Sequence, residues 1–333
     1  MSPTVRTLVA DRGDAGVRLD RVLRRHLGDV QAATRTRVQA WIADGYVTVN
    51  DRPVRRAAAR AALGDRVAVT LPEAPPRRAM DGEDVALDVL YEDDHLIAVD
   101  KPAGMVVHPA FRHPAGTLMN ALVGRARAWP AGQRPSIVGR LDKLTSGIVV
   151  VAKTAAMHAA LQRAWVRDAK KDYLAVVYGE VSEPCGTIEL RLRHDPIDRR
   201  MMVVASGVEA GRGVAHDGIS SITRFERLAS VSAPQTGLSL LRCRLVTGRR
   251  HQIRVHLAAR GWPIVGDPQY GEPRWSQIDD GALAAALQAF PRQALHAWRV
   301  AFTHPISRQR VAIEAPVPRD LEGLIKAVNW VIG

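Results

Sequence analysis

The stretch GRLDKLTSGIVVVAKT, residues 139–154, joins a short charged loop to a run of apolar, mostly β-branched residues. Its one carboxylate, Asp142, stands between two cations, Arg140 and Lys143. Small polar residues and glycine favour turns, so residues 145–147 predict a tight turn. The apolar run that follows predicts a buried strand. The loop would therefore place its carboxylate at the mouth of a rigid element.

Asp142 allows two interpretations. An aspartate just ahead of a turn is commonly a cap or turn residue. Neighbouring cations also keep a carboxylate ionised, which suits a nucleophile or a general base. The loop by itself leaves both interpretations open.

Apolar runs like this one recur along the chain and predict the framework of a sheet. Strands are expected at 95–100, 147–153, 172–179, 238–246 and 298–305. Strands and helices alternate here without a regular β-α-β rhythm. We therefore expect an α+β body with a mixed, mainly antiparallel sheet and helices packed on it.

Two helices are predicted within this body. Helical spacing of apolar residues marks 154–168, with Thr154 as a possible N-cap. The second helix is predicted over 249–261, where Arg250 and Arg254 would lie one turn apart on the same face. Phosphate anchoring and ion pairing are both natural uses for such a pair of arginines.

The sequence divides into three parts. A small module spans residues 16–71, a linker rich in proline and charge spans 72–87, and the body spans 88–330. Within the module, helical spacing appears at 17–27 and 34–45. A hairpin turning at Asn50-Asp51 and a last strand after Gly64-Asp65 complete an αα-ββ pattern.

The charge balance is strongly basic. Lysine and arginine number 47 against 34 aspartates and glutamates, giving a net charge of +13 and a pI near 10.6. Residues 1–70 hold thirteen arginines and seven aspartates, and so carry +6 of that charge. Such an excess favours a polyanionic partner, above all nucleic acid. The alternative is a solvated charged surface without a partner.

Several classes of protein are disfavoured. Cys185 and Cys243 are too few and too far apart for a paired-cysteine zinc site or a disulfide framework, which suits a reducing cytoplasm. His251 and His256 lack a third ligand on their helix face. The first residues lack the apolar segment of a signal peptide, so none is expected, and no apolar run is long enough to span a bilayer. We expect a cytoplasmic protein that binds no membrane, metal or cofactor, and the lack of an apolar dimer stripe favours a monomer.

The small module resembles the S4 RNA-binding domain. The match RLDRVL…TRTRVQAWIADGYVTVNDRPV…GDRVAV covers nearly all of residues 17–71. This resemblance implies that the module contacts RNA through Arg18, Arg35 and Arg37.

The body closely resembles the RluA-type family of RNA pseudouridine synthases, especially its RluD-like members. Six blocks match in family order, at 89–110, 139–154, 171–181, 199–204, 247–271 and 292–307. Two positions depart from the family pattern: Gly139 replaces the usual histidine, and Arg250 replaces a threonine or serine. The stretch 209–220 is also longer than usual.

The resemblance implies roles for four residues. Asp142 would be the catalytic aspartate and Arg254 the cation paired with it. Arg140 would help to displace the target base, and Tyr173 would be the aromatic residue against that base. From its strand alone, Tyr173 is equally compatible with a core residue and with a stacking partner for a nucleobase. Lys143 and Arg250 are further candidates for binding RNA.

The implied function is the cofactor-free isomerisation of uridine to pseudouridine in large-subunit ribosomal RNA, either free or in a pre-ribosomal particle. Two alternatives remain: the same chemistry on another RNA such as transfer RNA, or a non-catalytic RNA-binding assembly factor. A zinc deaminase is excluded because the sequence lacks the cysteine pair and the H-x-E arrangement.

Overall fold

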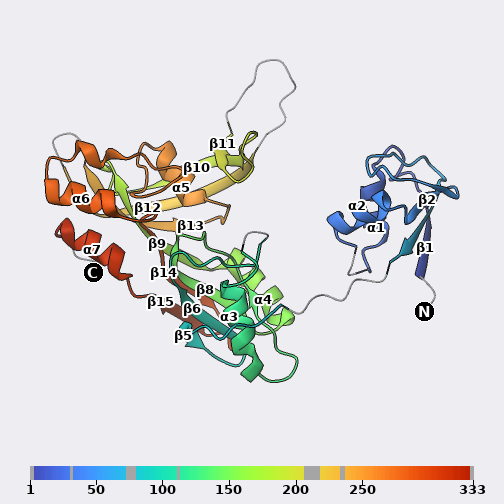
Figure 1. Cartoon of the computed structure of the whole chain (residues 1–333), viewed down its shortest axis with the longest axis horizontal. Coiled ribbons are helices and arrows are strands. Elements are labelled where there is room, and N and C mark those ends of the chain that lie inside the picture. Colours follow the sequence, from blue (N-terminus) through green and yellow to red (C-terminus); the bar gives the residue numbers. More distant parts are fainter. Residues whose placement is uncertain are drawn as a thin grey trace, which may run out of the picture. The chain divides into compact units, whose positions relative to one another are not determined.

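The computed structural model describes residues 4–30, 33–72, 80–110, 113–205, 218–232 and 237–330. The chain divides into two compact units, Met1–Ala79 and Met80–Gly333 (Figure 1). Residues 73–79 of the expected linker and 209–217 of the long stretch lie outside the described residues. Within the described part of the chain, no helix has the length and apolar character needed to cross a bilayer.

The N-terminal unit packs two helices on a four-stranded antiparallel sheet with strand order β1-β4-β2-β3. Its elements are β1 (Thr4–Val9), α1 (Leu19–His26), α2 (Arg35–Ala43), β2 (Val47–Val49), β3 (Arg52–Pro53) and β4 (Arg66–Leu71). Both predicted helices and the last strand are confirmed. Strand β1, which pairs with β4, lies before residue 16 and was not predicted.

The predicted hairpin is confirmed, with a backbone that explains its sequence. Asn50 and Asp51 join β2 to β3 at φ angles of 50° and 64°. A two-residue hairpin turn needs left-handed backbone at both central residues, and asparagine and aspartate tolerate it best after glycine. The core beneath the hairpin holds buried residues of α1, α2 and β4, among them Leu23, Ile42 and Val67.

The body is built on one mixed sheet with the order β11-β10-β12-β13-β9-β14-β8-β6-β5, with β15 beside β14 and β7 beside β8. Among the described strand pairs, only β8 and β14 run parallel. The predicted α+β class with a mainly antiparallel sheet is confirmed. The strands are β5 (Asp88–Glu92), β6 (Leu96–Lys101), β7 (Ser136–Ile137), β8 (Ser146–Ala152), β9 (Lys170–Tyr178), β10 (Cys185–His194), β11 (Met202–Val204), β12 (Ile219–Val231), β13 (Leu238–Leu245), β14 (Leu295–Thr303) and β15 (Arg310–Glu314).

Helices pack on this sheet in two groups, as Figure 1 shows. They are α3 (Leu118–Arg125), α4 (Ala155–Arg167), α5 (Gln252–Ala259), α6 (Gly281–Ala289) and α7 (Arg319–Ala327), with short 3-10 turns η1 (Ala126–Ala128) and η2 (Arg274–Gln277). Helices α3 and α4 join the cores formed by β6 and β8, whereas α5, α6 and α7 join the core formed by β9 and β13. Thr154 caps α4 by accepting a hydrogen bond from the Met157 amide at 3.1 Å.

Strands β6 and β8 are buried on both faces. Ile97 and Val99 of β6 pack with α3, whereas Leu96 and Ala98 pack with α4 on the opposite face. A strand covered on both faces has a nearly continuous apolar sequence. The run IVVVA in β8 therefore reflects a doubly covered strand at the centre of the body, and the loop that precedes it has a rigid support.

Two sequence-based expectations about the body need correction. Residues 80–87 are not linker, because the backbone at Asp81 and Glu83 hydrogen-bonds with Asn120 of α3. The predicted helix over 249–261 begins only at Gln252, because His251 has left-handed backbone at φ 53°. Arg250 therefore lies outside the helix and does not share a helix face with Arg254.

Candidate active site

A cleft of about 540 Å³ opens in the body, and Asp142 lies in its wall. The cleft is lined by residues 138–142, by parts of α4, β9 and β14, and by the segment 245–254 that leads into α5. The side chain of Asp142 is 26% exposed. The cleft therefore has access to solvent, while strands on two sides hold its walls.

The loop that carries Asp142 is a turn placed slightly earlier than predicted. The Thr145 amide donates to the Asp142 carbonyl at 3.1 Å, which closes the turn at Lys143 and Leu144. Ser146 already belongs to β8. The expected turn at 145–147 is wrong because these residues are buried against β14.

Lys101, at the end of β6, anchors this turn. It is fully buried, and its ammonium donates to the carbonyls of Pro102 (2.7 Å), Met105 (3.0 Å) and Lys143 (3.2 Å). Burial, and then Arg292, lower the pKa of Lys101 to about 7, while the Asp142 carboxylate opposes that shift. One buried lysine thus ties the loop that carries Asp142 to the segment after β6.

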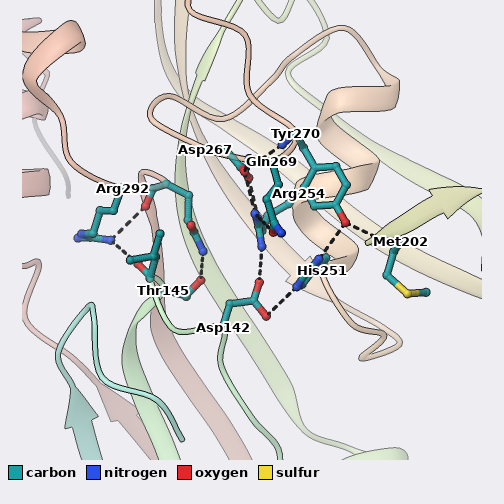
Figure 2. A network of polar contacts seen from close by, with 11 residues as sticks. Asp142, Thr145, Met202, His251, Arg254, Asp267, Gln269, Tyr270 and Arg292 are labelled. Atoms are coloured by element: carbon teal, nitrogen blue, oxygen red, sulfur yellow. Dashed lines mark hydrogen bonds and ion pairs between the residues drawn. The ribbon is translucent and has the colours of Figure 1, made fainter. Parts of the chain in front are cut away.

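A second set of contacts supports the other end of the turn (Figure 2). The Gln293 amide donates to the Thr145 hydroxyl at 3.0 Å, and Arg292 donates to the Leu144 carbonyl at 3.3 Å. Arg292 is in turn held by the carboxylate of Asp320 at 2.6 and 2.9 Å. The turn is consequently fixed from both β6 and the segment before β14.

The cation that contacts Asp142 is Arg254 of α5, whose Nη1 lies 3.0 Å from Oδ2 of the aspartate (Figure 2). Arg254 is 3% exposed and donates two parallel hydrogen bonds to Asp267, at 2.6 and 2.7 Å. A further bond reaches Gln269 at 2.8 Å. A guanidinium held in this way has a fixed direction. The remaining guanidinium nitrogen, Nη1, is therefore directed at Asp142.

Asp267 balances the buried guanidinium. Burial alone would raise the pKa of Asp267, but the hydrogen bonds and charge of Arg254 outweigh it and lower that pKa below its usual range. The backbone amides of Gln269 and Tyr270 also donate to the carboxylate, at 2.9 and 3.1 Å. Removing one member of such a buried pair is strongly destabilising, because the other charge is left unpaired.

His251 approaches the other oxygen of Asp142. Its Nε2 lies 3.8 Å from Oδ1, and its Nδ1 lies 2.8 Å from the Tyr270 hydroxyl (Figure 2). Burial lowers the pKa of His251 to about 4, which keeps the imidazole neutral at physiological pH. From the sequence alone, this histidine is notable only as a possible zinc ligand.

Tyr173 of β9 lies in the same cleft and is partly buried. Burial, followed by the negative charge of Asp142, raises the pKa of its hydroxyl. No side chain in the described part of the chain pairs with this hydroxyl. An aromatic ring with an unpaired hydroxyl beside a carboxylate is suited to contact a ligand.

The cations next to Asp142 in sequence point elsewhere. Arg140 and Lys143 are exposed, and neither forms an ion pair with Asp142 in the described structure. The ion-pair partner of Asp142 is therefore not a neighbour in the sequence but Arg254. Arg140 lines the main cleft and an adjoining cleft of about 340 Å³, together with Arg249 and Arg250.

The three arginines expected to bind RNA in the N-terminal unit differ in their surroundings. Arg18 donates to Asp20 at 2.9 and 3.1 Å, so part of its charge is already neutralised. Arg35 and Arg37 lie in the first turn of α2, and neither side chain forms an ion pair with another described residue. These two are free to contact an anion.

Sequence reasoning missed four polar residues that build the site: Lys101, Asp267, Gln269 and Tyr270. Two of them, Lys101 and Asp267, stand two residues after the end of an apolar run, in HLIAVDK and WPIVGDPQY. A buried lysine or aspartate needs a partner of opposite charge or a hydrogen-bond partner. A polar contact at each of these two residues could therefore have been predicted from the sequence.

The site contains one carboxylate open to the cleft, a fixed cation against it and an aromatic ring beside it. Such a set suits nucleophilic or general-base chemistry by a single aspartate. A family model described as RNA pseudouridylate synthase matches residues 95–259, which include Asp142, Tyr173 and Arg254. Together with the relatives that follow, this match shows that the chain belongs to the RNA pseudouridine synthase family.

Two relatives show how far the similarity extends. The chain is 39% identical over 320 residues to ribosomal large subunit pseudouridine synthase D of Neisseria meningitidis serogroup A, covering 96% of this chain and 80% of that protein. It is also 39% identical over 297 residues to the uncharacterised RNA pseudouridine synthase YlyB of Bacillus subtilis, covering 88% and 89% of the two chains.

Solved structures support the fold of the body. Human RNA pseudouridylate synthase domain containing 4 superposes with a TM-score of 0.58 at 19% identity, covering 74% of this chain and 94% of that one. Human RNA pseudouridylate synthase domain containing 1 gives a TM-score of 0.52 at 23% identity. At such identities the likeness concerns the fold alone.

Proposed function

We propose that this enzyme converts specific uridines of large-subunit ribosomal RNA to pseudouridine, with Asp142 as the catalytic carboxylate. The observation that carries the proposal is the geometry of Asp142, which faces the cleft and is held by a buried arginine at 3.0 Å. The names of the similar relatives favour ribosomal RNA as the substrate. Action on that RNA, together with two unpaired cysteines, favours a cytoplasmic location.

The reaction requires few catalytic groups. The bond from N1 of uracil to C1′ of ribose breaks, the detached uracil turns, and C5 forms the new bond to C1′ while its proton is lost and N1 gains one. The isomerisation involves no net oxidation or reduction. One ionised carboxylate is sufficient, either attacking C1′ as a nucleophile or removing a proton from C2′. Both routes use the same oxygen atoms of Asp142.

The target base must leave its stack before Asp142 can reach the sugar. Arg140 lines the main cleft and is exposed, and it would occupy the space that the base vacates. Tyr173 offers a ring against which the displaced uracil can stack. Extruding a base in this way requires a few kcal/mol, which these contacts would offset.

The surrounding cations would hold the RNA backbone. Arg250 and Arg249 line the adjoining cleft with Arg140, and Lys143 is exposed in the turn that directly follows Asp142. The N-terminal unit, which we propose acts as an S4-like RNA-binding module, would add Arg18, Arg35 and Arg37. Phosphate contacts of this kind determine where the RNA lies on the protein and how strongly its binding depends on salt, but they do not select a nucleotide sequence.

The substitution Asp142→Asn tests the proposal. It keeps the size of the side chain and removes the charge, so pseudouridine formation should fall at least 10³-fold, on the order expected for loss of a nucleophile. RNA affinity should change less than about threefold, since Asp142 would act on the sugar and would not contact phosphate. Tritium release from a large-subunit ribosomal transcript labelled at C5 of uridine measures turnover.

Asp279→Asn is the matched control, because this exposed aspartate lies outside the cleft and should leave turnover unchanged. Normal turnover by Asp142→Asn would refute the role of Asp142. Turnover of a transfer RNA transcript, with none of the ribosomal one, would reassign the substrate. Absence of turnover on both transcripts by the wild-type protein would favour a non-catalytic RNA-binding factor.

A further inference from the structure

His251 occupies a position where its own backbone is unfavourable. Its φ and ψ angles of 53° and 18° are left-handed, at the residue that precedes α5. A non-glycine residue in this conformation costs about 1 kcal/mol or more, which glycine would avoid. Such local strain gathers at functional sites, where a particular side chain is needed.

The surroundings of His251 determine which ring nitrogen carries its hydrogen. The Met202 amide donates to the Tyr270 hydroxyl oxygen at 2.8 Å, which leaves the hydroxyl proton available for Nδ1 of His251, also at 2.8 Å. The neutral ring then carries its hydrogen on Nε2. The opposite tautomer would aim an Nε2 lone pair at the Asp142 carboxylate, and that arrangement is repulsive.

The Asp142 carboxylate needs a second contact to define its orientation. Arg254 binds only Oδ2 through one N–H, so the carboxylate can still turn about the bond to its Cβ atom. His251 approaches Oδ1 from the other side, and its side chain is only 8% exposed (Figure 2). Polar contacts at active sites are often long before substrate binds and shorten in the complex, which applies to the present 3.8 Å.

We propose that His251 is a positioning residue, whose Nε2–H, set by the Tyr270 hydroxyl, orients the Asp142 carboxylate through Oδ1. This inference rests on the proposed role of Asp142 as the catalytic carboxylate. The tyrosine connects the site to β11 through Met202, so the orientation of the carboxylate also depends on where β11 lies. A misplacement of 1 Å in an active site can lower a rate about 100-fold.

The substitution His251→Gly separates this role from a structural one. Glycine relieves the left-handed backbone, so the melting temperature should stay equal or rise. The single-turnover rate of tritium release from the labelled large-subunit ribosomal transcript should fall about 10- to 100-fold, with KM within twofold. A folded glycine variant with the wild-type rate would overturn the inference.

Two further variants sharpen the comparison. Glutamine can place an amide N–H near the position of Nε2, whereas asparagine reaches only the position of Nδ1. Asparagine tolerates left-handed backbone better than glutamine does. His251→Asn should therefore be the more stable variant and His251→Gln the more active one. If activity instead followed stability, His251 would have only a structural role.

Asp142→Asn in the same assay distinguishes the two proposals. An active Asp142→Asn enzyme would overturn the proposed function, and this inference with it. An inactive Asp142→Asn enzyme beside a fully active His251→Gly enzyme would overturn only the positioning role. Both proposals stand if Asp142→Asn is inactive while His251→Gly is folded, slow and unchanged in KM.

Discussion

At the scale of single residues, Gly147 shows how tightly the end of the Asp142 loop is fitted to the sheet. It lies in β8 opposite Ala297 of β14, with φ at 110°. A Cβ atom at this position would overlap the carbonyl oxygen of Ala297, which is backbone and cannot rotate away. The close approach of these two strands holds Asp142, five residues earlier, at the edge of the cleft.

Replacing Gly147 by alanine should destabilise the body by about 2–4 kcal/mol, from overlap with the backbone and a backbone angle that alanine rarely adopts. Thermal unfolding measures the effect. Gly281→Ala is the matched control, because a Cβ there meets no atom within 4 Å and Gly281 begins helix α6. That variant should keep or slightly raise the melting temperature. Equal melting temperatures for the two variants would contradict the account of Gly147.

At the scale of elements, buried histidines connect helices and strands. Ser221 of β12 donates to the Leu190 carbonyl of β10 at 2.7 Å and so accepts from Nε2 of His256, in α5, at 3.0 Å. His296 of β14 contacts the Ser146 hydroxyl of β8 at 2.9 Å. Both histidines are fully buried, and burial lowers the pKa of each to about 4.

These pKa values predict how stability depends on pH. Between pH 6.5 and 4 the unfolded histidines bind protons that the folded ones exclude, so the free energy of unfolding falls as the pH falls through this window. His256→Gln keeps an amide donor for Ser221 but does not titrate. The loss between pH 6.5 and 4 should therefore be smaller in this variant, by on the order of 2–3 kcal/mol. Urea unfolding at pH 7, 5.5 and 4.5 measures it, and identical pH slopes for both proteins would contradict the prediction.

At the scale of the whole molecule, basic charge is divided between the body and the N-terminal unit. Arg35 and Arg37 offer charges that no ion pair neutralises within the described residues, whereas Arg6 is paired with Asp29 at 3.1 Å. If the N-terminal unit binds RNA, each unpaired arginine that contacts a phosphate releases about one counterion.

The double substitution Arg35→Ala/Arg37→Ala should weaken binding to the ribosomal transcript and make its salt dependence less steep. The slope of log K against log salt should fall by about 1–2. Filter binding between 50 and 200 mM salt measures the slope. Arg6→Ala is the control and should change it by less. An unchanged slope in the double variant would mean that this surface does not bind RNA.

Local sequence determined much of the architecture. Apolar runs located β6, β8, β9, β13 and β14, and the Asn50-Asp51 pair located the hairpin, because these signals depend only on neighbours along the chain. The ordered blocks indicate the family from the sequence alone. Short or half-exposed strands such as β1 and β11 were not predicted, because they are defined by their pairing with other strands and not by their composition.

The family resemblance implied the ion pair between Asp142 and Arg254, which the structure shows. Local sequence did not, and only the tertiary structure decided which other polar groups meet in the site. Asp142 is bordered by Arg140 and Lys143 in the sequence, yet its ion pair comes from Arg254, 112 residues later. A turn directs adjacent side chains to solvent, while the order of strands brings α5 against the loop before β8. Contacts between distant residues depend on that packing, which no local pattern encodes. The same reason explains why His251, Asp267 and Tyr270 became visible as parts of the site only in three dimensions.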